Sequence, residues 1–304
     1  MHSKIKVNLG KLKLKNPVMV ASGTFGYANE FKDLLDLKKL GAIVTKTITI
    51  KPRVGNPMPR TCETPAGMLN SIGLENPGIK IFLQDKLPLL KRIGIPVIVS
   101  IASEESPEEF VILARALDKI TGVAAIELNI SCPNIQKTKL IAQDGQATYD
   151  LVSKVRKATK KPVITKLSPN VSSISEIAQA AESAGSDAVS LINTLYGMSI
   201  DIKQRKSKLA SLTGGLSGPA VRPVAVKMVW EVYNKIKIPI IGMGGIMSAQ
   251  DALEFIIAGA SAISIGTANF VNPGAAVEIA SGIKEYLSAN KIKDIKELTG
   301  SLKI

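Results

Sequence analysis

The stretch Asn129-Ile130-Ser131-Cys132-Pro133-Asn134 places a thiol between two amide side chains. It follows the apolar run 123–126, which is typical of a short buried strand, and the Cys-Pro step ends that strand. Because α/β proteins place their chemistry at the carboxyl ends of strands, Cys132 is a candidate reactive thiol. A buried, inert cysteine before a structural proline is the alternative, and this stretch alone does not decide between the two.

The histidine and cysteine content of the chain limits which catalytic mechanisms and metal sites are possible. His2 is the only histidine, which excludes Ser-His-Asp hydrolysis and a histidine base, so a base must be Cys, Lys, Asp, Glu or Tyr. Cys62 and Cys132 are far apart and neither belongs to a CxxC motif. This spacing argues against a disulfide framework, a zinc site or an iron–sulfur cluster. We therefore expect no metal in this chain, and we interpret Cys62 as inert.

The formal net charge of +14 raises the possibility of nucleic-acid binding. However, the lysines are spread along the chain, and no RNA-binding signature with interleaved aromatic residues is present. A basic surface also suits an anionic substrate, an acidic partner subunit or a lysine-rich thermophile exterior. The sequence has neither a membrane-length apolar run nor the apolar core of a signal peptide, so we expect a cytoplasmic protein without a membrane span.

Short apolar runs alternate with helix-like stretches along the chain. The candidate strands are residues 18–21, 42–44, 97–100, 125–128, 163–166, 188–191, 240–243 and 262–265. Eight such strands without a composition break predict one (β/α)₈ barrel domain over residues 1–304, preceded by a β-hairpin over 5–14. A doubly wound sheet is the alternative fold, but no dinucleotide fingerprint supports it. Two long connections, 46–79 and 193–219, leave strand carboxyl ends and are expected at the catalytic face.

Two lysines stand where strands end. Lys46 follows the run 42–44, and Lys166 ends the run 163–166. A solvated surface lysine is the ordinary alternative, but a lysine at the end of a buried barrel strand points to the mouth of the barrel, where an unpaired ammonium is costly. The pair therefore indicates an anionic ligand, or a cofactor that acquires negative charge.

Four amide side chains occupy strand ends or the long connections, namely Asn70, Asn129, Asn134 and Asn193. Turn capping explains any one of them. Four amides around one mouth favour recognition of a flat polar ring with both donors and acceptors. The loops Gly244-Gly245 and Gly266-Thr267 follow the last two strands, where barrels commonly hold a phosphate; tight turns are the alternative interpretation.

These motifs together resemble class 1 dihydroorotate dehydrogenase, in order and over nearly the whole chain. The matching stretches are Ala21-Ser22-Gly23-Thr24-Phe25-Gly26, Thr45-Lys46-Thr47, Gly55-Asn56-Pro57-Met58-Pro59-Arg60, Asn70-Ser71-Ile72-Gly73-Leu74, Asn129-Ile130-Ser131-Cys132-Pro133-Asn134, Lys166-Leu167-Ser168-Pro169-Asn170, Asn193-Thr194-Leu195, Gly214-Gly215-Leu216-Ser217-Gly218-Pro219 and the two final glycine loops. So many motifs in register make the resemblance highly specific.

The resemblance implies a (β/α)₈ barrel that binds FMN and oxidises (S)-dihydroorotate to orotate in pyrimidine biosynthesis. Cys132 would be the base that takes the C5 proton while hydride leaves C6 for the flavin, and Lys166 would stabilise the reduced flavin. The substrate would be held by Lys46, Asn70, Ser71, Ile72, Gly73, Leu74, Asn129, Asn134, Asn193 and Thr194. The FMN site would include Ser22, Lys46, Thr47, Ser100, Asn129, Lys166, Ile192, Gly218, Gly244, Gly245, Gly266 and Thr267.

The subclass implied is closest to class 1B, whose barrel pairs with an FAD and iron–sulfur subunit and reduces NAD. The stretches Ala21–Gly26 and Asn193–Gly197 look like class 1B, whereas Ser100 matches the class 1A pattern, and 135–140 lacks the glycine pair and Phe-Gly usual in class 1B. A homodimer core, with or without an electron-transfer subunit, is therefore expected, and the electron acceptor stays open. Class 2 enzymes resemble the chain less, because they have serine where Cys132 stands.

Two other functions compete with this interpretation. A related flavin barrel that acts on a free pyrimidine base would need no partner for the substrate carboxylate, and Lys46 argues against it. A basic barrel that serves as a nucleic-acid or scaffold protein would explain the charge, but it leaves the strand-end motifs without a role.

Overall fold

The computed structural model describes residues 3–131 and 141–303. Eight parallel strands form a closed barrel in the order β10-β15-β16-β3-β4-β7-β8-β9. Their bounds are β3 (Val18–Val20), β4 (Ala42–Val44), β7 (Val97–Ile101), β8 (Ala125–Asn129), β9 (Val163–Lys166), β10 (Ala188–Leu191), β15 (Ile240–Gly242) and β16 (Ala262–Ile265). Each strand overlaps its predicted run, and the (β/α)₈ barrel is confirmed. The predicted hairpin is present as β1 (Val7–Leu9) and β2 (Leu12–Leu14).

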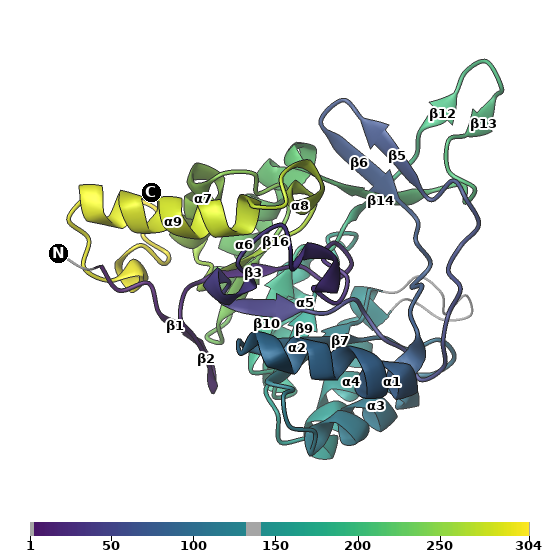
Figure 1. The fold of residues 1–304 in the computed structure, drawn as a ribbon, viewed down its shortest axis with the longest axis horizontal. Helices are drawn as coiled ribbons and strands as arrows, with labels where there is room; N and C mark the ends of the chain where they lie inside the picture. Colours follow the sequence, from purple (N-terminus) through teal and green to yellow (C-terminus); the bar gives the residue numbers. More distant parts are fainter. Residues whose placement is uncertain (1–2, 132–140, 304) are drawn as a thin grey trace.

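Helices surround the barrel (Figure 1). They are α1 (Gly78–Ile81), α2 (Leu87–Ile93), α3 (Glu108–Asp118), α4 (Gly145–Ala158), α5 (Ile174–Ser183), α6 (Arg222–Tyr233), α7 (Ala249–Ala258), α8 (Ala268–Val271) and α9 (Ala275–Ala289). Local sequence explains where they begin. The Ser173 side chain caps α5 by accepting from Glu176 N, and Ser248 forms a capping box with Asp251 at the start of α7.

The core lies between the barrel and its helices. All residues of β3, β4, β7, β8, β9, β10, β15 and β16 are buried, as expected for a parallel sheet that is covered on one face and closed on the other. Phe25, Phe82, Phe110 and Phe255 are fully buried. Each such side chain contributes roughly 1.5–3 kcal/mol by its removal from water. The barrel is therefore a packed scaffold that fixes the positions of its strand ends.

The two long connections form a second, antiparallel sheet. Its strands are β5 (Thr61–Thr64) and β6 (Gly67–Asn70) from the first connection, and β11 (Leu195–Gly197) and β14 (Gly214–Ser217) from the second, in the order β11-β14-β6-β5. A small hairpin of β12 (Ile200–Asp201) and β13 (Lys206–Ser207) extends beyond it. This sheet lies at the opposite end of the molecule from the two termini and the β1–β2 hairpin (Figure 1). The sequence analysis identified both connections but not these strands.

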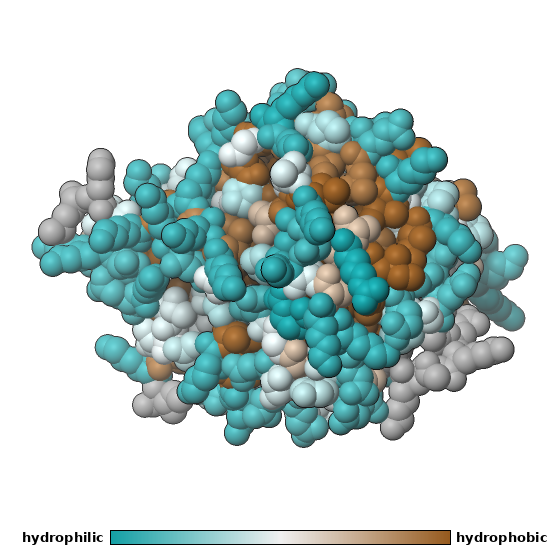
Figure 2. Space-filling model, turned by 90° about the horizontal axis from the view of Figure 1, so that it is seen from below, coloured by the Kyte–Doolittle hydropathy of each residue, from teal (hydrophilic) through white to brown (hydrophobic). Residues whose placement is uncertain are grey.

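The surface is mixed in character. Hydrophilic side chains cover most of the face shown in Figure 2 and surround a patch of apolar ones. Within the parts of the chain that the structure describes, no helix is long and apolar enough to cross a membrane.

Candidate functional site

Every barrel strand brings a predicted site residue to its carboxyl end. Ser22 follows β3, Lys46 and Thr47 follow β4, Ser100 lies in β7, Asn129 ends β8, Lys166 ends β9, Ile192 and Asn193 follow β10, Gly244 and Gly245 follow β15, and Gly266 and Thr267 follow β16. Because parallel strands end at the same side of a barrel, these residues surround one mouth. We call this ring of residues the rim.

Part of the rim is a chain of hydrogen bonds between buried and half-buried side chains. Asn129 Nδ2 donates to Thr47 Oγ1 at 3.3 Å, and the Thr47 and Ser100 hydroxyl oxygens lie 2.9 Å apart. Asn193 Nδ2 donates to Asn129 Oδ1 at 3.2 Å, and Asn193 Oδ1 accepts from the Thr194 backbone N–H. Residues from four strands thus fix one another's orientation, which leaves the amides with defined donors and acceptors for a ligand.

Lys166 crosses the barrel. Its Nζ donates to Ser22 Oγ at 3.2 Å, and β9 and β3 lie on opposite sides of the closed barrel. The side chain is only 5% exposed. Among the described residues no carboxylate lies within ion-pair distance of Lys166. A buried ammonium with a neutral partner favours an additional negative charge at the mouth.

Lys46 lies on the same rim in a different environment. Burial lowers the pKa of the Lys46 ammonium, Glu75 and Glu30 oppose that shift, and Arg60 adds to it. Its backbone N–H donates to Gly26 O at 2.9 Å, which fixes the residue just past β4. Lys46 also takes part in none of the ion pairs formed among residues 3–131 and 141–303. An anionic ligand would restore the stability of its charged form.

The glycine loops meet on one side of the rim. Gly218 (φ 99°) and Gly245 (φ 74°) adopt the left-handed backbone region, and a Cβ on Gly245 would lie 2.7 Å from Gly218 O. Thr267 Oγ1 donates to Ser217 Oγ at 2.7 Å, which ties the loop after β16 to the same place. At Gly266 a Cβ would meet nothing nearer than 3.9 Å, so space remains there. The loops predicted to hold a phosphate are therefore side by side, with room beside one of them.

The antiparallel sheet brings the predicted residues Asn70 and Thr194 together. Asn70 Nδ2 donates to Gly215 O at 3.2 Å, and the Thr194 side chain occupies the space that a Cβ on Gly215 would need. Asn170, which the site prediction omitted, holds this region by donating to Thr194 O and accepting from Tyr196 N, each at 2.9 Å. Its amide in a strand-end loop is the same signal that identified the other four amides.

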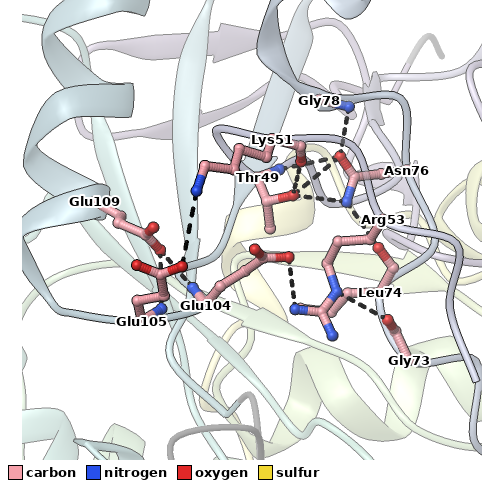
Figure 3. A network of polar contacts seen from close by, with 10 residues as sticks. All are labelled: Thr49, Lys51, Arg53, Gly73, Leu74, Asn76, Gly78, Glu104, Glu105 and Glu109. Atoms are coloured by element: carbon pink, nitrogen blue, oxygen red, sulfur yellow. Dashed lines mark hydrogen bonds and ion pairs between the residues drawn. The ribbon is translucent and has the colours of Figure 1, made fainter.

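The predicted residues Ser71, Ile72, Gly73 and Leu74 form a loop between β6 and α1, and a polar network anchors it (Figure 3). Asn76 is buried, and its Oδ1 accepts from Thr49 N at 3.1 Å and Gly78 N at 2.8 Å. Arg53 donates to Gly73 O at 3.2 Å and pairs with Glu104 at 2.6 Å. These contacts fix the 71–74 loop to the segments after β4 and β7. Sequence reasoning missed Asn76 and Arg53, because neither ends a strand.

Cys132 and Asn134 lie outside the described residues, and their predicted roles stay predictions. The other residues predicted to bind substrate or cofactor are all described, and each lies at the rim, in the antiparallel sheet or in the 71–74 loop. A hollow of about 540 Å³ between α2 and α3 is lined by Leu83, Leu87, Pro88, Lys91, Arg92, Lys119, Ile120 and Thr121. These residues precede β7 and β8, at the amino ends of the strands, so the hollow is separate from the rim.

The chemistry of the rim is specific. Two cations without an ion-pair partner among the described residues, several oriented amides and paired glycine loops suit a flat, polar, anionic ligand next to a phosphate. The described side chains at the rim supply no histidine, and Cys132, the base that the family resemblance implies, lies outside the described residues.

Comparisons with known proteins identify the family. Residues 4–287 match the family model described as dihydroorotate dehydrogenase. The chain is 54% identical over 299 residues to a protein of Geotalea uraniireducens (98% of each chain), and 54% identical over 303 residues to one of Trichlorobacter lovleyi (99% of each). It is 52% identical over 301 residues to one of Thermoanaerobacter pseudethanolicus (99% of each).

All three relatives are named dihydroorotate dehydrogenase B (NAD(+)), catalytic subunit. The predicted resemblance to class 1, closest to class 1B, is thereby confirmed, and Ser100 does not move the chain away from the B type. The chain belongs to the dihydroorotate dehydrogenase family.

Proposed function

We propose that this protein oxidises (S)-dihydroorotate to orotate in pyrimidine biosynthesis. The observation that carries the proposal is the pair of rim lysines, Lys46 and Lys166, which have no carboxylate partner among the described residues and lie at a mouth that also holds amide side chains. Orotate is a flat ring with alternating N–H and carbonyl groups and one carboxylate. Its donors, acceptors and charge match that arrangement.

The proposed cofactor is FMN, and the residues present fit it. The adjoining loops at Gly218, Gly245 and Thr267, with open space at Gly266, suit its phosphate. Thr47, Ser100 and Asn129 offer polar atoms for its ring, and Lys166 offers a positive charge. When bound, FMN supplies the hydride acceptor for the reaction.

The protein's own residues supply binding and proton transfer. Oxidation removes a proton from C5 and a hydride from C6, and the C5–C6 bond becomes double. We assign the proton to the Cys132 thiolate, because the family resemblance points to it and the described rim holds no competing histidine. Asn70, Asn129, Asn193 and Thr194 would orient the ring, while Lys46 would bind the carboxylate.

The Lys46 assignment separates this function from its nearest rival. An enzyme that acts on a free pyrimidine base has no substrate carboxylate to bind. A half-buried ammonium whose pKa burial already lowers would then stay uncompensated at the mouth. Turnover of uracil-type rings equal to that of dihydroorotate would favour the rival.

We also propose that the chain acts with an electron-transfer subunit that passes electrons to NAD, since its relatives are named as catalytic subunits of an NAD(+) enzyme. A second copy of the chain would complete a homodimer core. In support, the segment 198–202, which includes β12, exposes Met198 (50%), Ile200 (52%) and Ile202 (85%). A single domain over residues 1–304 and a cytoplasmic location remain predictions.

The test combines one variant with two substrates under anaerobic conditions. Cys132→Ala should keep bound FMN and lose most dihydroorotate-driven bleaching near neutral pH, by about 10²–10⁴-fold in rate. Cys62→Ala, on β5, is the matched control and should bleach normally. Full bleaching by Cys132→Ala would remove its role as the base. Equal bleaching of the wild-type protein by dihydrouracil would favour the rival substrate class.

A further inference from the structure

A buried carboxylate in the barrel interior has no place in the proposed mechanism. Glu127 lies in β8, two residues before the rim residue Asn129, and is only 2% exposed. Its Oε2 accepts from Ser190 Oγ at 3.1 Å, whereas its Oε1 is buried without a hydrogen-bond partner among the described residues. A carboxylate removed from water with half of its acceptors unsatisfied is costly, so a compensating interaction is expected.

The orientation of Glu127 follows from the register of the strands. Lys166 points into the barrel, because its Nζ reaches Ser22 on the opposite side. Ser190 is in register with Lys166 on the neighbouring strand β10, so it points inward as well. Glu127 reaches Ser190 past the intervening strand β9, which only an inward-facing side chain can do.

Glu127 and Lys166 therefore share the barrel interior. Glu127 forms none of the ion pairs found among the described residues, and neither does Lys166. Ser190 links them, since it is in register with Lys166 and donates to Glu127. Opposite charges that do not touch still attract over several ångströms in a medium of low dielectric constant. The carboxylate thus offsets part of the positive field that Lys166 produces at the mouth.

We infer that Glu127 is a positioning residue that sets the reduction potential of the bound flavin by opposing the charge of Lys166 from one layer deeper in the barrel. This inference rests on the proposed function, because it assumes a flavin at the rim. Removal of the Glu127 charge should raise the reduction potential. Loss of the negative charge strengthens the positive field at the flavin, which favours the more negative, reduced form.

The test measures the flavin reduction potential of the intact holoprotein by equilibration with a reference dye. Glu127→Gln keeps the shape and can still accept from Ser190, but it lacks the charge. We expect its potential to rise by about 30 mV, which corresponds to about tenfold in the equilibrium constant of a two-electron couple. Glu285→Gln removes the same charge from the exposed face of α9 and should leave the potential unchanged.

A second variant tests whether a change in reduction potential comes from the lost charge or from a change in packing. Glu127→Leu keeps a similar volume but removes both the charge and the hydrogen bond from Ser190, so it separates the effect of the charge from that of the hydrogen bond. It should also raise the potential, whatever its effect on the melting temperature. An unchanged potential in either variant, or loss of flavin from both, would overturn the inference. Wild-type protein that binds no flavin would instead contradict the proposed function, so the two failures are distinguishable.

Discussion

The rim and the antiparallel sheet both contribute to the mouth, but they are supported differently. At the rim, Thr47, Ser100 and Asn129 are buried and bond to one another across neighbouring barrel strands. In the sheet, strand β5 alternates between exposed and half-buried residues, and Asn70 is only half-buried and bonds to a backbone carbonyl. The rim is held from both sides by parallel strands, whereas β5 is an edge strand.

From this difference we infer that the rim and the antiparallel sheet have different roles. The flavin must keep one geometry through both half-reactions, and the rim offers fixed, buried groups for it. The substrate must enter and leave, and the more exposed sheet with its 71–74 loop suits that task. We therefore expect rim substitutions to change flavin reduction, and sheet or loop substitutions to change substrate affinity.

The largest effect is expected at the rim. Lys166→Met removes the buried positive charge at the mouth and should slow flavin reduction by dihydroorotate on the order of 10²–10³-fold. Flavin content should be retained, because the glycine loops remain. Stopped-flow absorbance measures the rate, and Lys154→Met, which loses an exposed ion pair on α4, is the control. A wild-type rate in Lys166→Met would contradict the assignment of Lys166.

In the sheet, Asn70→Ala should raise KM for dihydroorotate by roughly 10- to 100-fold, since a ligand group loses its partner. The flavin reduction rate at saturating substrate should change little. Steady-state kinetics separates the two quantities, and Asn234→Ala, an amide at the end of α6, is the matched control. A fall in kcat without a change in KM would show that Asn70 acts on flavin reduction, as the rim residues do. It would contradict the proposal that the sheet acts on substrate affinity.

A smaller effect is expected from the network behind the 71–74 loop. Arg53→Met breaks the contacts to Glu104 and Gly73 and should raise KM by about three- to tenfold through loosening of the loop. Lys51→Met is a neighbouring control in Figure 3, because Lys51 pairs with Glu105 at 3.8 Å while both side chains are more than 70% exposed (71% and 74%). Equal effects of the two variants would show that the network does not position the loop.

The smallest expected effect is a drift of orotate affinity with pH. Burial lowers the pKa of Lys46 below 10.5 in the free protein, and a bound carboxylate raises it again. Binding therefore takes up a proton, and affinity should fall as pH rises through the lowered pKa. The unfolded chain, whose Lys46 has the ordinary pKa, holds more protons than the folded free protein over that range. The stability of the free protein should therefore rise with pH there. Spectral titration of the bound flavin with orotate measures the drift, and Lys46→Met should lack it.

The sequence predicted the rim well for a physical reason. Strands of a parallel barrel are buried on both faces, so runs such as Val163-Ile164-Thr165-Lys166 can be predicted as strands from local sequence alone. The parallel topology then places their carboxyl ends together. Lys166 and Asn129 could be assigned to one mouth on this basis alone. The glycine loops followed for the same reason.

The antiparallel sheet was not predictable in this way. Its strands have three or four residues, contain polar residues and glycine, and pair over long separations, as Asn70 and Gly215 do across 145 positions. Such pairing leaves no local periodicity. Glu127 was also missed, because a single charged residue in an apolar run shows neither its direction nor its partner. Only the register with Ser190 and Lys166 gives its place.

The most direct test is the absorbance spectrum of the purified protein before and after anaerobic addition of dihydroorotate. We predict flavin bands that bleach on addition of the substrate, which would establish cofactor and substrate together. A colourless protein that cannot be reconstituted with FMN would contradict the account.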